Sequence, residues 1–165
     1  ILGGSASSRL FQEIREKRGM AYSVYSFASQ YTDTGLVGVY VGTREENLGA
    51  CLEIAAAEIA DVAAGNLRER ELERAKENLK GRIALSMEST SNRMSRLGRS
   101  LITDTELLSL DRIIAEIDAV DAVAVAELAG VLLDPARISA AGIGPSEEPF
   151  VEAVEHVHPG LAAAA

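Results

Sequence analysis

Two side chains near the start of the chain, Arg15 and Tyr22, form the pair best suited to chemistry on a peptide. The pattern predicts that Arg15 lies in the last turns of a helix and that Tyr22 begins a strand, with Gly19 reversing the chain between them. A reversal of this length brings both side chains to one edge of a sheet. A guanidinium beside a phenol can hold a peptide carbonyl or a developing oxyanion. The spacing leaves one alternative open, a surface arginine and an unrelated strand tyrosine.

Two further groups of residues could bind a charged partner or a metal. Arg93, Arg96 and Arg99 recur every three residues and form a basic stripe on one side of a helix. Such a stripe is usually a solvated face, and an acidic partner is the alternative. His156 and His158 could chelate a metal, but we expect them on an exposed tail rather than in a native metal site.

Cys51 is the only cysteine, which excludes an intrachain disulfide and a thiolate metal cluster built from this chain alone. It lies on the apolar stripe of its helix, so we expect a small core residue. The turn Gly3-Gly4-Ser5 precedes a helix and could cradle an anion, but without a preceding strand and a third glycine the phosphate signal is weak.

Length and charge narrow the class of protein. The 165 residues, with a net charge of −9, suit one domain with a single core. Residues 1–100 are nearly neutral, whereas residues 101–165 carry almost only acidic charges. Backbone binding to nucleic acid needs a basic face, so we expect no nucleic-acid partner. No apolar run approaches the roughly 18 residues of a membrane span, and with no visible signal segment we expect a cytoplasmic protein without a membrane partner.

The elements expected to position these residues make an α+β fold, in which helices pack on one face of an antiparallel sheet. The turn composition of residues 32–35 predicts a hairpin. Thr43 and Glu46 have capping-box spacing, Asp121 is a candidate N-cap, and the polar stretch 88–92 should break a long helix. The expected strands are 21–31, 36–41 and 138–143, and the expected helices are 5–18, 43–65, 69–87, 94–101, 110–117 and 122–133. We expect the helices from Asn47 and Glu71 to lie on the sheet, further strands before Ile1, a domain over 1–145 and a tail over 146–165 that is loose from Gly160.

The segment from Ile1 to Val24, ILGGSASSRLFQEIREKRGMAYSV, strongly resembles the C-terminal half of the insulinase/pitrilysin family of zinc metallopeptidases, in its processing-peptidase branch. The resemblance implies two related α+β halves that close around a cavity. The first half carries the inverted zinc motif His-x-x-Glu-His. The second contributes an arginine and a tyrosine, seven positions apart, that reach the peptide near its scissile carbonyl. Arg15 and Tyr22 match that pair, which implies that they bind substrate.

The chain departs from the family in having no His-x-x-Glu-His motif. We therefore expect a truncated C-terminal portion that holds no metal, contains no catalytic residue and is inactive by itself. The resemblance implies a zinc cofactor in the parent enzyme, bound by an N-terminal half that belongs to the same chain or to a partner subunit. It also implies an extended peptide as substrate. An open sheet edge could lead to homo-oligomers. The alternative from another class is a non-catalytic subunit or structural relative that pairs with a separate zinc-bearing chain.

Overall fold

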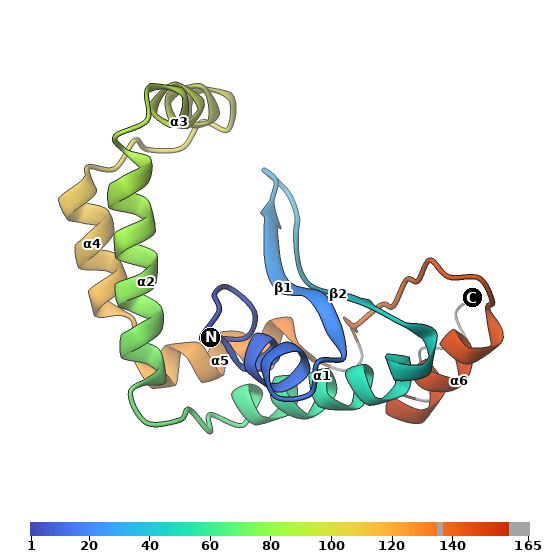
Figure 1. Ribbon diagram of the computed structural model, residues 1–165. Helices are drawn as coiled ribbons and strands as arrows, with labels where there is room; N and C mark the ends of the chain where they lie inside the picture. Colours follow the sequence, from blue (N-terminus) through green and yellow to red (C-terminus); the bar gives the residue numbers. More distant parts are fainter. Residues whose placement is uncertain (135–136, 159–165) are drawn as a thin grey trace.

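The computed structural model describes residues 1–134 and 137–158 (Figure 1). The fold is α+β, as expected, with one antiparallel hairpin and helices around it. In chain order the elements are η1 (a π-helical turn, Phe11–Glu16), β1 (Ala21–Gln30), β2 (Gly35–Thr43), η2 (a 3-10 turn, Glu45–Asn47), α1 (Leu48–Ala63), α2 (Glu71–Ser86), α3 (Thr90–Ile102), α4 (Leu110–Ala119), α5 (Ala122–Leu132) and α6 (Glu148–Val157). Among the described residues, no helix is long and apolar enough to cross a bilayer.

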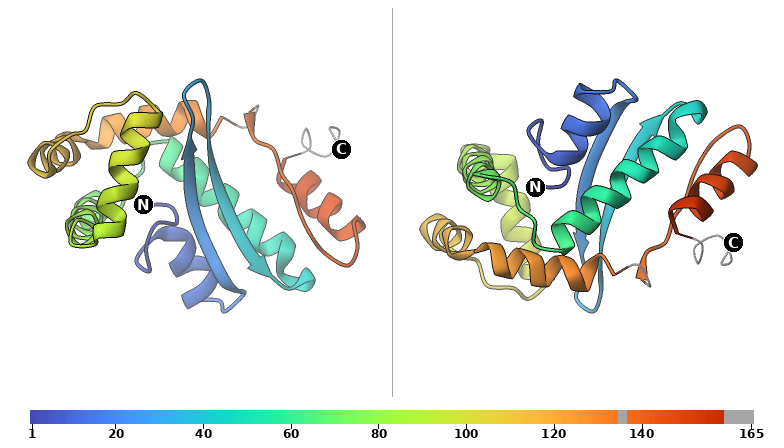
Figure 2. Two further views of the ribbon diagram at one scale, coloured as in Figure 1. Left: turned by 90° about the horizontal axis from the view of Figure 1, so that it is seen from above. Right: turned by 90° about the horizontal axis from the view of Figure 1, so that it is seen from below.

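The hairpin has one covered face and one open face. β1 and β2 pair antiparallel, with Val24 opposite Val41 and Tyr25 opposite Tyr40. Side chains alternate across a strand, so Val24 is buried while its neighbour Tyr25 is exposed. Figure 2 (right) shows η1 and α1 lying across the covered face.

The core lies between that covered face and the two helical elements. Leu10 and Ile14 from the η1 region are fully buried against Val24 of β1 and against Cys51 and Ala55 of α1. Cys51 is therefore a core residue, as predicted, and burial raises the pKa of its thiol. Burying a Leu or Ile side chain contributes about 1.5–3 kcal/mol, so this cluster holds the first part of the chain together.

The helices α2, α3 and α4 lie away from the sheet. α2 and α4 lie side by side, and α3 crosses the far end of α2 (Figure 1). The expectation that the helix from Glu71 packs on the sheet is wrong, because η1 and α1 already fill the covered face and α2 packs on α4 instead. Lys80 joins the pair through an ion pair of 2.8 Å to Asp118.

Residues 138–143 do not form the expected strand, and within the described ranges the sheet has only β1 and β2. Ile143 is fully exposed, and this segment has no neighbouring strand to supply hydrogen-bond partners. The chain then turns into α6, which packs along α1 together with α5. The division at residue 145 remains a prediction, with α6 lying beyond it, and the loose tail expected from Gly160 falls outside the described residues.

The predicted helix caps and the predicted helix break can be compared with the helix ends in the structure. Asp121 caps α5, since its carboxylate accepts a hydrogen bond of 2.8 Å from the backbone N–H of Ala124. The polar stretch does separate α2 from α3, which Ser89 caps. The capping box at Thr43 is wrong: this residue ends β2, and its hydroxyl donates to the carbonyl oxygen of Met20 at 2.6 Å.

Candidate peptide-binding site

Arg15 lies in a widened helical turn. In η1 the backbone N–H of Lys17 reaches the carbonyl of Gln12, five residues back, at 3.0 Å. Turns of this π-helical type are rare in proteins, and those that occur are often found at functional sites. Ile14 anchors the turn in the core, and Gly19 ends it with a positive φ of 61°, which glycine adopts without strain. The chain therefore reverses as the sequence predicts, with Arg15 on the outside.

Tyr22 lies at an irregularity of β1. Ala21 pairs with Thr43 and Ser23 with Gly42, so Tyr22 is one residue too many and forms a β-bulge. Bulges re-aim side chains and are frequent next to active sites. The Tyr22 side chain is 84% exposed, the largest exposure of any tyrosine in the described chain.

The structure brings Arg15 and Tyr22 together. The guanidinium carbon of Arg15 lies 4.9 Å from the centroid of the Tyr22 ring and 4.8 Å from that of Phe11, within cation–π range of both. Arg15 Nη1 also donates a 2.7 Å hydrogen bond to the backbone carbonyl of Tyr22. The proximity expected from the spacing is thus observed, and the role of the two residues in binding substrate stays a prediction. Phe11 was missed, although its position four residues before Arg15 puts it on the same helix face.

Two hydrogen-bond donors remain available at this site. Neither Arg15 Nη2 nor the Tyr22 hydroxyl has a protein partner among residues 1–134 and 137–158. The guanidinium is fixed between two rings and one carbonyl, so its free edge has a defined direction. A charged donor and a neutral donor held this way suit a carbonyl oxygen that gains negative charge.

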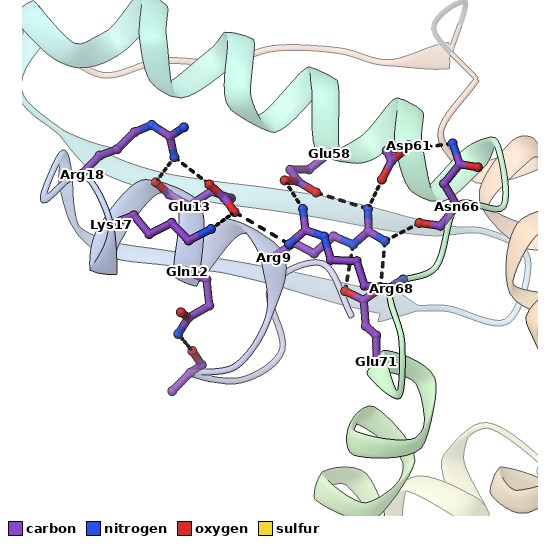
Figure 3. A network of polar contacts seen from close by, with 11 residues as sticks. Arg9, Gln12, Glu13, Lys17, Arg18, Glu58, Asp61, Asn66, Arg68 and Glu71 are labelled. Atoms are coloured by element: carbon purple, nitrogen blue, oxygen red, sulfur yellow. Dashed lines mark hydrogen bonds and ion pairs between the residues drawn. The ribbon is translucent and has the colours of Figure 1, made fainter.

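A second polar cluster, which the sequence analysis missed, surrounds Arg9 (Figure 3). The Arg9 side chain is fully buried and binds the Glu71 carboxylate through Nε and Nη2, both at 2.8 Å. Its Nη1 contacts Asp61 at 2.6 Å and Glu58 at 3.2 Å, and Nη2 also donates to the Asn66 carbonyl at 2.6 Å. This cluster pins the start of η1 to α1 and to the first residue of α2.

The charges in the cluster stabilise one another. The hydrogen bond to Glu71 raises the pKa of Arg9 further above its usual range. Burial works to raise the pKa of Glu71, but hydrogen bonds from Arg9 and from the backbone of Arg68 outweigh it, and the pKa is lowered. Arg68 extends the cluster toward η1, with its guanidinium 2.6 Å from Glu58 and 3.7 Å from Glu13. Because Arg15 lies two residues after Glu13, the cluster also fixes the turn that carries Arg15.

The basic stripe of α3 has no common partner. Arg96 donates to the backbone carbonyl of Leu108 and contacts the sulfur of Met87 at 3.6 Å, so it fastens α3 to the neighbouring loop. The side chains of Arg93 and Arg99 are exposed and contact no carboxylate in the described part of the chain.

The histidines and the glycine turn do not form a site with Arg15. His156 lies 3.0 Å from Glu53 on the surface, and His158 follows at the end of α6. Gly3 accepts a 3.0 Å hydrogen bond from the backbone N–H of Ser26. A Cβ at Gly3 would lie 2.3 Å from that nitrogen, so this glycine permits close packing on β1 rather than anion binding.

The described residues do not fit a zinc ion. Over residues 1–134 and 137–158 no group of three or more His, Cys, Asp or Glu could hold a metal. Three carboxylates do converge at Glu58, Asp61 and Glu71, but the guanidinium of Arg9 already lies among them.

Comparison with known proteins places this arrangement in a family. Residues 1–79 match the peptidase M16 inactive domain. The chain is 43% identical to the uncharacterized zinc protease YmxG of Bacillus subtilis over 121 residues, which is 73% of this chain and 30% of that protein. It is 40% identical to an uncharacterized zinc protease of Mycobacterium tuberculosis over 144 residues, 87% of this chain and 33% of that one. The chain thus spans about a third of the length of these relatives.

Two solved structures support the same family assignment. A peptidase M16 inactive domain from Pseudomonas fluorescens superposes with a TM-score of 0.68 at 26% identity, over 81% of this chain and 32% of that one. A conserved protein from Enterococcus faecalis gives a TM-score of 0.65 at 28% identity, over 77% and 29%. By sequence and by fold, the chain belongs to the M16 peptidase family, to the C-terminal part that carries its inactive domain.

Proposed function

We propose that this chain is the substrate-clamping part of a zinc metalloendopeptidase, with Arg15 and Tyr22 as its peptide-binding residues. The supporting observation is the pair of unpartnered donors, Arg15 Nη2 and the Tyr22 hydroxyl, held next to each other by ring contacts of 4.8 and 4.9 Å. The names of the relatives, zinc proteases, support hydrolysis of peptide bonds by the parent protein.

The two residues supply different kinds of hydrogen-bond donor in this proposal. Arg15 donates from a guanidinium that stays charged at any working pH, and Tyr22 donates from a neutral hydroxyl. Both donors bind and orient the carbonyl of an extended peptide. In this proposal the zinc ion and the residues that activate water belong to an N-terminal half, as the resemblance to the family implies. The described residues of this chain do not form a group that could hold a metal.

A non-catalytic role is the second candidate. The matching domain is described as inactive, and this chain could serve as part of a subunit that pairs with a separate zinc-bearing chain. The two candidates differ in the sequence that precedes Ile1 in the full-length protein. A His-x-x-Glu-His motif there, with about one zinc per molecule by elemental analysis, favours the single-chain enzyme. In either case we expect the isolated chain to hold no stoichiometric zinc and to cleave no peptide.

The decisive experiment compares Tyr22→Phe and Arg15→Ala in the full-length protein. Losing one such donor typically lowers turnover by about 10²–10³-fold, and we expect that loss with zinc content and Tm near wild type. Arg93→Ala is the matched control, since Arg93 is exposed and belongs to α3, which lies away from the start of β1 (Figure 1). Full activity of the Tyr22→Phe variant would remove the hydroxyl from the proposal. Unfolding of both site variants would make the pair structural.

A further inference from the structure

Phe11, the first residue of η1, is the second aromatic side chain beside Arg15. Its ring centroid lies 4.8 Å from the guanidinium carbon of Arg15. Phe11 is half-buried and packs against the core cluster that contains Leu10 and Ile14, so its ring has a fixed place. The ring of Tyr22 lies equally near the guanidinium, at 4.9 Å, but that side chain is 84% exposed and has little protein around it. Phe11 is therefore the anchored one of the two rings.

An aromatic partner holds an arginine without occupying its hydrogen-bond donors. A carboxylate binds the edge of a guanidinium, commonly through two parallel N–H bonds, as Glu71 binds Arg9 through Nε and Nη2 in this chain. A ring instead attracts the guanidinium through its face and leaves the N–H edge to other partners. In Arg15, Nη1 donates to the Tyr22 carbonyl, and Nε lies 3.8 Å from the Glu16 carboxylate, too far for a hydrogen bond. In the described part of the chain, Nη2 is thereby left for a ligand.

The spacing in η1 sets the contact between Phe11 and Arg15. The two residues are four positions apart, which puts their side chains on one face of a helical turn. The Arg15 side chain is 36% exposed and long, so without a neighbour it would sample many orientations. Two contacts of different kinds, one to a ring and one to a carbonyl, limit that freedom. A guanidinium held in this way needs less ordering when a ligand arrives.

We propose that Phe11 is a positioning residue for substrate binding: its ring holds the Arg15 guanidinium so that Nη2 is aimed at the carbonyl of a bound peptide. The inference rests on the proposed function, in which Arg15 binds that carbonyl, and it adds a residue that itself touches no substrate. Phe11 acts only through Arg15. Replacing the ring should therefore cost less than the loss of Arg15 itself, and should cost nothing further once Arg15 is gone.

The first measurement follows the guanidinium itself and needs no activity. The full-length protein is treated with phenylglyoxal, which modifies arginine side chains, and the rate at each arginine is read by mass spectrometry after digestion with a glutamate-specific protease. We expect Phe11→Leu to raise the rate at Arg15 about fivefold, which corresponds to the loss of one exposed cation–π contact. Phe11→Tyr keeps a ring and should leave the rate near that of wild type. An unchanged rate at Arg15 in Phe11→Leu would overturn the inference.

Two other arginines separate positioning from a general loosening of the turn. Arg9 is fully buried at the start of η1, and Arg93 is exposed on α3. Both rates should be unchanged in Phe11→Leu. A rise at Arg9 equal to that at Arg15 would overturn the inference, since the turn would then have opened as a whole. Phe150→Leu is the matched control: it makes the same substitution in α6, which lies apart from η1 in both views of Figure 2, and it should leave all of these rates unchanged.

Cleavage of a quenched-fluorescent peptide of mixed sequence then tests whether the held orientation matters. We expect Phe11→Leu to lower kcat/KM about fivefold, and Phe11→Tyr to stay near wild type. In an Arg15→Ala background, Phe11→Leu should have no further effect. A loss of the same size there would overturn the inference, because Phe11 would then act by another route. Full activity of Arg15→Ala, or no cleavage by wild type, would count against the proposed function instead, and the phenylglyoxal rates would still decide whether Phe11 holds Arg15.

Discussion

The first and second parts of the molecule hold together in different ways. The hairpin unit, which comprises η1, β1, β2 and α1, buries Leu10, Ile14, Val24 and Cys51 in one cluster and adds the buried side chain of Arg9. The arm, which comprises α2, α3 and α4, has only one buried residue in its described helices. That residue is Glu71, and it belongs to the Arg9 cluster.

This difference in burial shows that the candidate site lies on the more tightly packed part of the molecule. Arg15 and Tyr22 are both fixed by the hairpin unit, one above the core and the other at a bulge of the sheet. The arm instead presents apolar side chains to solvent, with Leu101 and Ile102 more than 80% exposed. The same substitution should therefore be costly in the unit and nearly silent in the arm.

The largest difference between the hairpin unit and the arm is expected when an arginine is replaced. Arg9→Met leaves buried carboxylates without their cation, and removing one partner of a buried ion pair typically costs about 3–5 kcal/mol. Arg93→Met in the arm should change the free energy of unfolding by no more than about 0.5 kcal/mol, as for other surface substitutions. Chemical denaturation of both variants gives the two values. Similar values would contradict the contrast between unit and arm.

Apolar truncation sharpens the same contrast. Ile14 is fully buried, so Ile14→Ala should lower the free energy of unfolding by about 2–5 kcal/mol. Leu101→Ala removes a side chain that is 83% exposed and should cost no more than about 0.5 kcal/mol. Thermal unfolding of the two variants, followed by circular dichroism, measures both losses of stability. A large loss in the Leu101 variant would mean that the arm is buried in the protein under the conditions of the measurement.

Acid should weaken the hairpin unit first. The folded pKa of Glu71 is lowered from 4.5, and those of Glu13 and Asp61 are lowered from 4.5 and 3.8. A lowered folded pKa contributes stability that is present above the unfolded value and is lost as the pH falls through the folded value. We therefore expect stability to fall below about pH 4.5, and Glu71→Gln to flatten that fall. Exposed Glu88 contacts no cation in the described residues, and E88Q is the control. If the stability of Glu71→Gln falls with decreasing pH as steeply as that of wild type, the Arg9 cluster is not the cause of the acid sensitivity.

The smallest effect is expected at the surface contact between α2 and α4. Lys80 pairs with Glu77 at 2.6 Å and with Asp118 at 2.8 Å, and both partners are exposed. Exposed pairs contribute little and are screened by salt. Lys80→Met should lower Tm by no more than about 2 °C and make Tm less sensitive to salt. A shift as large as that of Ile14→Ala would show that the arm depends on this contact.

Much of the local structure followed from the sequence, because local signals govern it. The hairpin came from the turn composition of residues 32–35, and the break after α2 from the polar stretch 88–92. The cap at Asp121 and the core position of Cys51 followed from short-range pattern as well. The strand expected at 138–143 failed because a strand exists only with a neighbour, and an apolar run says nothing of whether one is present.

For the candidate site, the sequence determined which residues meet and the tertiary structure decided how. Spacing and Gly19 were enough to bring Arg15 to Tyr22, since a short reversal leaves the chain few paths. The bulge at Tyr22 depends on register with β2. The Arg9 cluster joins side chains up to 62 positions apart, and no periodicity encodes such a contact. Local composition thus determined the elements and the pair, whereas long-range packing decided which charges are buried and which aromatic rings remain exposed.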